Sequence, residues 1–301
     1  MGDTGFIGKN FKKYYLSKGK KVDGVSLSKK FNLTNKKKLK KKLKEFNPDF
    51  VINCAARVGS LDYVMRNPAK ILHLNMKILL NIYKVISELE KKPVLVNLIS
   101  NCAYPGKLRI QNEGNFWEGI PHASSLAFGS TRRFITILNQ VYKKQYNVIT
   151  KNFILPGVYG PGDHTDPNRL HALDGLIIRM MDAQKNKNKS FEIWGSGKPI
   201  REWIYVEDVV KLIDKFLMKN PNFEIINLAQ KKGYTILEIT KIIKKYLKYD
   251  VKFINNYKYS DGDSIKILDN KLFKKHISSY KYTPLEIGIK KTIKYYRSVL
   301  K

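Results

Sequence analysis

Short runs of apolar and β-branched residues alternate along the first half of the chain with stretches of helical length. The apolar runs cover residues 21–26, 50–54, 94–100 and 148–154. The helical stretches between them cover residues 36–46, 69–89 and 132–146. Strands that alternate with helices build a parallel sheet through right-handed crossovers. The pattern therefore predicts an α/β fold with a Rossmann-like, doubly wound parallel sheet.

A glycine-rich loop opens the chain. It reads Met1-Gly2-Asp3-Thr4-Gly5-Phe6-Ile7-Gly8, and a predicted helix at residues 10–17 follows. Glycines let the backbone approach a pyrophosphate, whose charge is stabilised by N–H groups at a helix N-terminus. The candidate cofactor-binding residues are therefore Gly2, Gly5, Phe6, Ile7 and Gly8. Such a loop normally follows a buried strand, so we expect about five to ten apolar or Lys residues upstream of Met1 in the functional gene product.

The regular alternation of apolar runs and helical stretches ends after residue 159. Loops at Gly160-Pro161-Gly162 and Asp166-Pro167-Asn168 precede a predicted helix at residues 176–184. We predict a dinucleotide-binding domain at residues 1–160 and a mainly substrate-binding domain at residues 161–301, with residues 203–228 returning to the first. Runs of about 18 apolar residues and a secretory signal are absent from the sequence, which predicts a cytoplasmic protein without a membrane partner.

Lysine dominates the charge, with 57 Lys and Arg against 25 Asp and Glu and a formal net charge of +32. A basic surface attracts polyphosphates. The lysines are dispersed, however, which favours general amino-acid usage over a nucleic-acid partner. The two cysteines, Cys54 and Cys102, form neither a disulfide framework nor a metal-ligand spacing. We therefore predict two reduced thiols, each core or catalytic, and no metal site.

The residues after the second predicted strand bear on the choice of cofactor. They read Ser26-Leu27-Ser28-Lys29-Lys30. A protein that prefers NAD usually offers Asp or Glu here to the ribose hydroxyls. Hydroxyls and cations instead suit a 2′-phosphate, so NADP(H) is favoured and NAD is the alternative. General lysine enrichment would explain the same residues without a cofactor.

Further motifs follow the glycine loop in a fixed order. They are Asn32-Leu33, Ala55-Ala56-Arg57-Val58-Gly59, Ser100-Asn101-Cys102-Ala103-Tyr104-Pro105, Tyr159-Gly160-Pro161, Trp194-Gly195-Ser196-Gly197 with Arg201-Glu202, and Ser260-Asp261-Gly262 with Asp269. In this order the chain resembles the extended short-chain dehydrogenase/reductase (NAD-dependent epimerase/dehydratase) family, and within it the GDP-L-fucose synthase group. The resemblance covers nearly the whole chain. It implies a GDP-linked sugar substrate and a homodimer formed through residues 69–89 and 132–146.

The resemblance also implies two chemical steps. In that group a Cys and His pair epimerises C3 and C5 beside a ketone at C4, and NADPH then reduces the ketone while a Tyr supplies the proton. The matching residues are Cys102 and His171, with Ser100 as the supporting hydroxyl. A thiol and an imidazole titrate near neutral pH, as proton exchange with carbon requires. Taken without the resemblance, Cys102 is a core thiol and His171 a loop histidine.

The resemblance assigns binding roles as well. The matches for cofactor binding are Asn32, Ala55 and Ala56. Arg179 and Arg201 match residues that hold the diphosphate and nucleotide, a role that suits a guanidinium. Trp194 is either a packed aromatic or a stacking partner of the nucleotide. Lys266 matches a further cation on the substrate side.

The chain departs from the family at the Tyr-x-x-x-Lys motif, where it has Phe128 and Arg132. Phe128 has no proton to give, and the guanidinium of Arg132 is not equivalent to an ammonium. We therefore expect impaired ketone reduction. Three hypotheses follow: a reductase with a substitute donor such as His171, Ser100 or water; an epimerase that keeps Cys102 and His171 but does not reduce; or a non-catalytic binding or partner subunit.

Overall fold

The computed structural model describes residues 1–166, 169–259 and 261–300. The helices are α1 (Phe6–Ser17), α2 (Lys36–Phe46), α3 (Leu61–Arg66), α4 (Pro68–Ser87), α5 (Leu126–Tyr146), α6 (Ala172–Lys185), α7 (Val206–Lys219), α8 (Ile236–Leu247), α9 (Lys271–His276) and α10 (Leu285–Val299), with short turns η2 (Asn101–Ala103) and η4 (Ala123–Ser125). The strands are β1 (Phe50–Asn53), β2 (Val94–Ser100), β3 (Ile110–Gln111), β4 (Thr150–Leu155), β5 (Gly157–Tyr159), β6 (Ser190–Trp194), β7 (Ile200–Tyr205), β8 (Ile225–Asn227), β9 (Gly233–Thr235), β10 (Lys252–Asn256) and β11 (Ile265–Leu268). Pro167, Asn168 and Ser260, which belong to the sequence motifs, lie outside the described residues.

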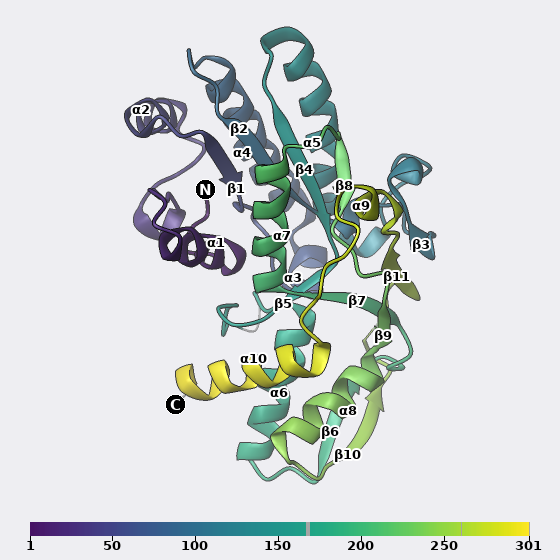
Figure 1. Ribbon diagram of the computed structural model, residues 1–301. Helices are drawn as coiled ribbons and strands as arrows, with labels where there is room; N and C mark the ends of the chain where they lie inside the picture. The colour runs from purple at the N-terminus through teal and green to yellow at the C-terminus, as the bar shows by residue number, and fades with distance from the viewer. Residues whose placement is uncertain (167–168, 260, 301) are drawn as a thin grey trace.

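Four parallel strands form the central sheet in the order β1-β2-β4-β8 (Figure 1). Alternate residues of β2 show why helices cover both of its faces. Leu95 and Ile99 pack into the core that includes α2, α4 and α5, whereas Val96 and Leu98 pack into the core that includes α1 and α7. Side chains of a strand point to opposite faces in turn. The predicted doubly wound α/β fold is confirmed.

Most predicted elements lie close to those observed, although α1, α5 and α6 begin earlier than predicted. The predicted strand at residues 94–100 is β2, and the predicted helix at residues 36–46 is α2. The Asn35 side chain caps α2 by accepting from Lys38 N, and Asn47 ends it in the left-handed conformation. Helix α5 begins at Leu126 instead of residue 132, so it contains both positions of the altered motif.

The predicted strand at residues 21–26 is wrong, because the structure assigns these residues to no strand. A strand exists through its hydrogen-bond ladder. Among the described residues, the ladder here reduces to a bond from Gly2 N to Val25 O at 2.7 Å. On its other side Met1 contacts β1, since the Met1 ammonium donates to Ile52 O at 2.7 Å and Cys54 N donates to Met1 O at 3.1 Å. Residues 1 and 2 thus lie between β1 and residues 21–26, but in the part of the chain that the structure describes a single hydrogen bond joins them to the latter segment.

The lower part of Figure 1 holds α6, α8 and α10 with the parallel pair β6 and β10. Its core includes Ile177 and Met180 from α6, Ile243 from α8 and Ile289 from α10. A second sheet, in the order β3-β11-β7-β5 with β9 paired to β7, lies toward the central sheet. Between β7 and β9 the chain returns upward: α7 packs near α1, and β8 pairs with β4.

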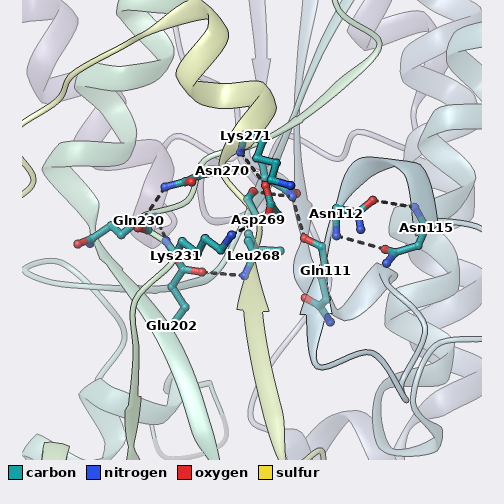
Figure 2. Close-up of polar contacts among 11 residues, drawn as sticks. Gln111, Asn112, Asn115, Glu202, Gln230, Lys231, Leu268, Asp269, Asn270 and Lys271 are labelled. Carbon is teal, nitrogen blue, oxygen red and sulfur yellow. Dashed lines mark hydrogen bonds and ion pairs between the residues drawn. The ribbon is translucent and has the colours of Figure 1, made fainter.

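Glu202 of β7 joins three segments beneath the central sheet (Figure 2). Its carboxylate accepts from Gln230 N at 2.6 Å, Lys231 N at 3.0 Å and Leu268 N at 2.8 Å. Burial raises the pKa of Glu202 to about 7. Lys231 Nζ also donates to Asp269 Oδ2 at 3.0 Å. These bonds fix β7 against β11 and so position Arg201, the neighbour of Glu202, at the candidate site.

Candidate active site

The glycine loop lies against the carboxyl end of β1, the edge where open α/β sheets bind ligands. Gly2 has a φ of +71°, and a Cβ there would lie 3.0 Å from the backbone of Ala55. A Cβ at Gly8 would lie 2.1 Å from Gly2 O, so the loop packs tightly on the first turn of α1. Within the described residues, no side chain caps α1 and its first turn holds no acidic residue. The leading N–H groups of α1, from Phe6 and Ile7 onward, therefore remain available to an anion.

Three hydroxyl groups gather beside the glycine loop. Thr4 Oγ1 lies 2.6 Å from Ser28 Oγ, and Ser26 Oγ lies 3.2 Å from the same oxygen. Lys29 contacts the loop itself, because its ammonium pairs with the buried Asp3. Of the predicted phosphate-facing groups, the hydroxyls therefore lie together, while the charge of Lys29 is already paired.

Two other predicted cofactor residues differ in their surroundings. Asn32 closes a local turn, since its Oδ1 accepts from Thr34 N at 3.0 Å and from Thr34 Oγ1 at 2.9 Å. Ala56 is exposed in the loop that follows β1. The printed contacts of Asn32 are thus structural, whereas Ala56 stands next to Ala55 and the glycine loop.

The segment after β2 carries the candidate thiol. Ser100 Oγ accepts from Cys102 N at 3.3 Å and caps η2. A Cβ at Gly129 would lie 2.2 Å from Cys102 O, so η2 packs directly on α5, one residue beyond Phe128. Cys54 is different, because burial raises its pKa to about 11 and keeps its thiol protonated. The structure therefore brings Ser100, Cys102 and Phe128 together and leaves Cys54 inert.

His171 stands directly before α6, next to the glycine loop. Its ring centroid lies 5.6 Å from that of Phe6. Asp163 Oδ2 accepts from His171 N at 3.1 Å and lies 2.8 Å from His171 Nδ1. Burial lowers the pKa of His171, but the carboxylate of Asp163 outweighs burial, so the pKa is raised. Asp163 holds the proton of the ring on Nδ1, which leaves Nε2 as the nitrogen for proton transfer.

A second buried carboxyl group lies near this pair. Asp174, in the first turn of α6, accepts from Tyr296 OH at 3.0 Å. Burial raises the pKa of Asp174 well above its usual range, and the charge of Asp163 adds to this. Asp163 has the opposite shift: burial opposes its charge, but His171 lowers its pKa. Asp163 is therefore the charged carboxylate and Asp174 the neutral acid.

Phe128 and Arg132 lie in the first half of α5, and their side chains pack against α3 and α4. Phe128 is 9% exposed and packs with Val64 and Ile71. Arg132 is 3% exposed, and its Nη2 donates to Asn75 Oδ1 of α4 at 3.1 Å. Burial lowers the pKa of Arg132 to about 10. None of the ion pairs formed by the described residues includes Arg132, so this guanidinium is buried without a carboxylate.

An aromatic stack holds Arg179 in the lower part of the molecule. The guanidinium carbon lies 4.0 Å from the Trp194 ring centroid, and the Tyr259 ring stacks on Trp194 at 4.3 Å. Two groups that close to one centroid must occupy opposite faces of the indole. A base therefore reaches Trp194 only at its edge or by displacing one of them. A pocket of about 350 Å³ opens beside Arg179, between α6 and β6.

Arg201 and Lys266 are directly paired residues of β7 and β11. Burial lowers the pKa of Arg201, and its Nη2 donates to Asp261 O at 3.1 Å. Lys266 Nζ lies 2.6 Å from Asp263 Oδ2. The guanidinium of Arg201 is thus bound to the backbone of the segment before β11, whereas the ammonium of Lys266 is paired with a buried carboxylate.

Sequence reasoning missed three side chains at this edge. Asp163 directly follows the Gly160-Pro161-Gly162 loop and precedes His171 by eight residues. This short spacing could have marked it as a partner of the candidate histidine. His122 Nε2 lies 3.6 Å from Asp263 Oδ1, across the two parts of the molecule, and no motif announces this contact. Tyr63 packs against the cluster formed by Val64, Ile71 and Phe128, and the sequence carries no signal for this.

Two kinds of site are absent from the part of the chain that the structure describes. No three His, Cys, Asp or Glu side chains gather as metal ligands there. None of the described helices is both long and apolar enough to cross a membrane.

Comparison with known proteins supports one family. The model of the NAD dependent epimerase/dehydratase family matches residues 1–229. The chain is 30% identical to the GDP-L-colitose synthase of Yersinia pseudotuberculosis, over 98% of this chain and 96% of that protein. It is 26% identical to a probable GDP-L-fucose synthase of Drosophila melanogaster, over 98% of this chain and 95% of that protein.

A solved structure extends the similarity to three dimensions. The GDP-L-fucose synthetase of Naegleria fowleri bound to NADP superposes with a TM-score of 0.87 at 25% identity, covering 99% of this chain and 92% of that chain. The family match, the full-length relatives and the shared fold agree with the order of motifs in the sequence. The chain belongs to the NAD dependent epimerase/dehydratase family.

Proposed function

We propose that this chain is an NADP(H)-dependent nucleotide-sugar epimerase/reductase whose substrate is a GDP-linked 4-keto-6-deoxyhexose. One observation carries the proposal: the ring of His171, bound to Asp163, lies 5.6 Å from Phe6 of the glycine loop. A side chain able to exchange protons with a sugar therefore stands beside the candidate cofactor loop. The names of the relatives, GDP-L-colitose synthase and probable GDP-L-fucose synthase, support the class of sugar.

Proton exchange is assigned to Cys102 and His171. A ketone at C4 acidifies the protons on C3 and C5, so one group removes a proton and another returns it. His171 Nε2 takes up a proton, and Asp163 stabilises the imidazolium that results. Ser100 holds the turn that carries Cys102.

Reduction of the C4 ketone follows the exchange. NADPH, when bound at the glycine loop, supplies a hydride. The chain's own part is to hold the pyrophosphate at the N-terminus of α1 and the 2′-phosphate near Thr4, Ser26 and Ser28. Phe128 has no proton for the C4 alkoxide, so reduction requires another donor and is slower than with Tyr and Lys in place.

Binding of the GDP group is assigned to the lower part of the molecule. Arg179 and Arg201 offer guanidinium groups that match phosphate oxygens. Trp194 stacks against Arg179 and is assigned to one side of the nucleotide site. Lys266, which is paired with Asp263, is assigned as a further cation on the substrate side.

Incubation with GDP-4-keto-6-deoxymannose in D₂O, with and without NADPH, tests the proposal. We expect deuterium at C3 and C5, loss of NADPH and a reduced sugar. Deuterium without loss of NADPH identifies an epimerase that does not reduce. Neither deuterium nor loss of NADPH contradicts the proposal and supports the second candidate, a non-catalytic nucleotide-sugar-binding or partner subunit. That candidate is favoured by one observation, the apolar side chain of Phe128 over a fully buried Arg132.

We also propose a homodimer that forms through α4 and α5. These helices pack side by side, and each exposes large apolar side chains: Leu72 and Leu80 on α4, Ile137 and Val141 on α5. Such a surface is stabilised by a second copy of the same face. Leu80→Glu should give monomers in analytical ultracentrifugation, while dimers in that variant would contradict this interface. The cytoplasmic location and the absence of a nucleic-acid partner stay predictions.

A further inference from the structure

We propose that Tyr63, with Arg57 bound to its hydroxyl, is the general acid that supplies the proton Phe128 lacks. The inference rests on the proposed reductase function and names a catalytic residue for it.

The position of Tyr63 supports this role. Tyr63 lies in α3 and packs against the cluster formed by Val64, Ile71 and Phe128. Helix α3 also packs against η4, the turn that leads into Phe128. Both α3 and Cys102 follow the carboxyl ends of neighbouring parallel strands, β1 and β2, which is the ligand-binding edge. A phenol therefore packs against the cluster that contains Phe128.

The bond to Arg57 places a cationic donor on the phenol oxygen. Arg57 Nε donates to Tyr63 OH at 3.0 Å, and the guanidinium carbon lies 5.5 Å from the ring centroid. A donor on the oxygen stabilises the phenolate that remains after proton transfer. The phenol hydrogen is not used in this bond, so it remains free for a substrate oxygen.

Arg57 is held in place by the network that also binds Arg132. Asn75 Oδ1 accepts from Arg57 N at 2.9 Å and from Arg132 Nη2 at 3.1 Å, and Asn75 Nδ2 donates to Arg57 O at 2.8 Å. Asn75 is fully buried. The two cations therefore have separate tasks: Arg132 is packed against α4, while Arg57 stays exposed and contacts a phenol.

The other candidate donors have partners of their own. His171 is bound to Asp163, and Ser100 accepts from Cys102 N. Both belong to the proton-exchange step. Tyr63 has no part in proton exchange, so it can hold its proton until the ketone is reduced.

The proposed reduction transfers a hydride to C4 and a proton to the oxygen on C4. The C4 carbonyl carbon receives a hydride from NADPH, which is oxidised to NADP⁺. The carbonyl oxygen becomes an alkoxide and takes the hydroxyl proton of Tyr63. The Tyr63 phenolate, stabilised by Arg57, then regains a proton from water.

The test measures single-turnover loss of NADPH with GDP-4-keto-6-deoxymannose in four variants of the full chain. They are Tyr63→Phe, Phe128→Tyr with Arg132→Lys, the combination of all three changes, and Tyr246→Phe. Tyr246 is a matched control, because its hydroxyl also contacts a charged side chain, that of Glu286 at 2.7 Å, but on the far helices α8 and α10. Affinity for NADPH and exchange at C3 and C5 are measured in each variant.

We expect Tyr63→Phe to slow hydride transfer by about 10² or more, as loss of a general acid does, with NADPH affinity and exchange unchanged. The triple variant should recover the lost rate, and Tyr246→Phe should match the unchanged chain. Arg57→Lys should keep more activity than Arg57→Gln, since only Lys retains a cation for the phenol. A merely structural Tyr63 would not give this rescue pattern.

Two results separate the failure of this inference from failure of the proposed function. If Tyr63→Phe reduces the ketone as fast as the unchanged chain, Tyr63 is not the acid and the proposed function stands. If the unchanged chain does not reduce and the Phe128→Tyr, Arg132→Lys variant does, the acid assignment fails but the substrate class is right. If none of the variants reduces the ketone, the proposed reductase function fails and the acid assignment fails with it.

Discussion

Two corners of the candidate active site differ in how their polar groups are paired. The exchange corner, before α6, contains His171 and Asp163, and both the backbone N and ring Nδ1 of His171 contact the carboxylate. The redox corner, in α5, contains Phe128 and Arg132. There the guanidinium is buried, has a neutral acceptor in Asn75, and leaves Nε without a partner among the described residues.

The difference agrees with the proposal that the exchange corner transfers protons. A buried charge with a hydrogen-bonded counter-ion is held in a defined orientation, whereas a buried charge without one is costly. His171 therefore has an oriented ring and an open Nε2. Arg132 has become part of the packing between α4 and α5, so the redox corner depends on a side chain outside α5.

Removal of the thiol should have the largest effect and tests whether the exchange chemistry extends to Cys102. Cys102→Ser should slow exchange at one of the carbons C3 and C5 by about 10² to 10⁴, because a serine hydroxyl is a poor base at neutral pH. Deuterium incorporation followed by mass spectrometry measures this. NADPH affinity should stay unchanged, and its loss would show that Cys102 is a structural thiol.

Restoring the redox corner should have the next largest effect. In a Tyr63→Phe background, Phe128→Tyr with Arg132→Lys should raise hydride transfer by about 10². In the otherwise unchanged chain the gain should be smaller, because Tyr63 already supplies the proton. Neither single change should give half of the combined gain, since a Tyr works poorly without a placed Lys. Stopped-flow loss of NADPH measures both gains, and equal gains would mean that the redox corner does not use Tyr63.

The sequence predicted local helices and strands better than contacts between distant segments, for physical reasons. Strand β2 and helix α2 follow from periodicity, since apolar spacing reports burial directly. The residues 21–26 did not become a strand, because a strand depends on a neighbour that periodicity does not show. Likewise Phe128 and Arg132 mark a departure from the Tyr-x-x-x-Lys motif in the sequence, but Asn75 and Tyr63 come from distant segments that only packing brings near them.

Removal of the counter-ion should have a moderate effect on the exchange corner. The carboxylate raises the pKa of His171, so Asp163→Asn should lower it and move the corresponding limb of the exchange-pH profile to lower pH. We expect the rate at neutral pH to fall by about tenfold to 10². Asp263→Asn, near His122, is the matched control and should leave that limb in place. An unmoved limb in Asp163→Asn would show that the pair does not govern exchange.

The same pair gives a pH-dependent contribution to the free energy of unfolding. The lowered pKa of Asp163 adds stability above the unfolded pKa of Asp, about 3.9, and this is lost as pH falls through the folded value. The raised pKa of His171 adds stability that is lost as pH rises through the folded value. Urea unfolding should therefore show the largest deficit of Asp163→Asn at mildly acidic pH.

The smallest expected effect concerns the cofactor that the redox corner needs. The hydroxyls of Thr4, Ser26 and Ser28 lie together beside the glycine loop, and none of them repels a phosphate as an Asp or Glu would. Lys29 is paired with Asp3, and this pairing weakens the attraction of its charge for a 2′-phosphate. The preference for NADPH should therefore be modest, about tenfold or about 1.4 kcal/mol.

Calorimetric titration of NADPH and NADH measures this preference, and Ser28→Glu is the decisive variant. A carboxylate at residue 28 would stand within the hydroxyl cluster, repel the 2′-phosphate and accept from the ribose hydroxyls of NADH, so the preference should reverse. Lys13→Gln, at an exposed residue of α1, lowers the net charge by the same one unit elsewhere and should lower both affinities alike. If the two variants behave equally, the basic character of the whole surface determines cofactor binding. If NADH binds the unchanged chain as tightly as NADPH, the hydroxyl cluster does not select the phosphate.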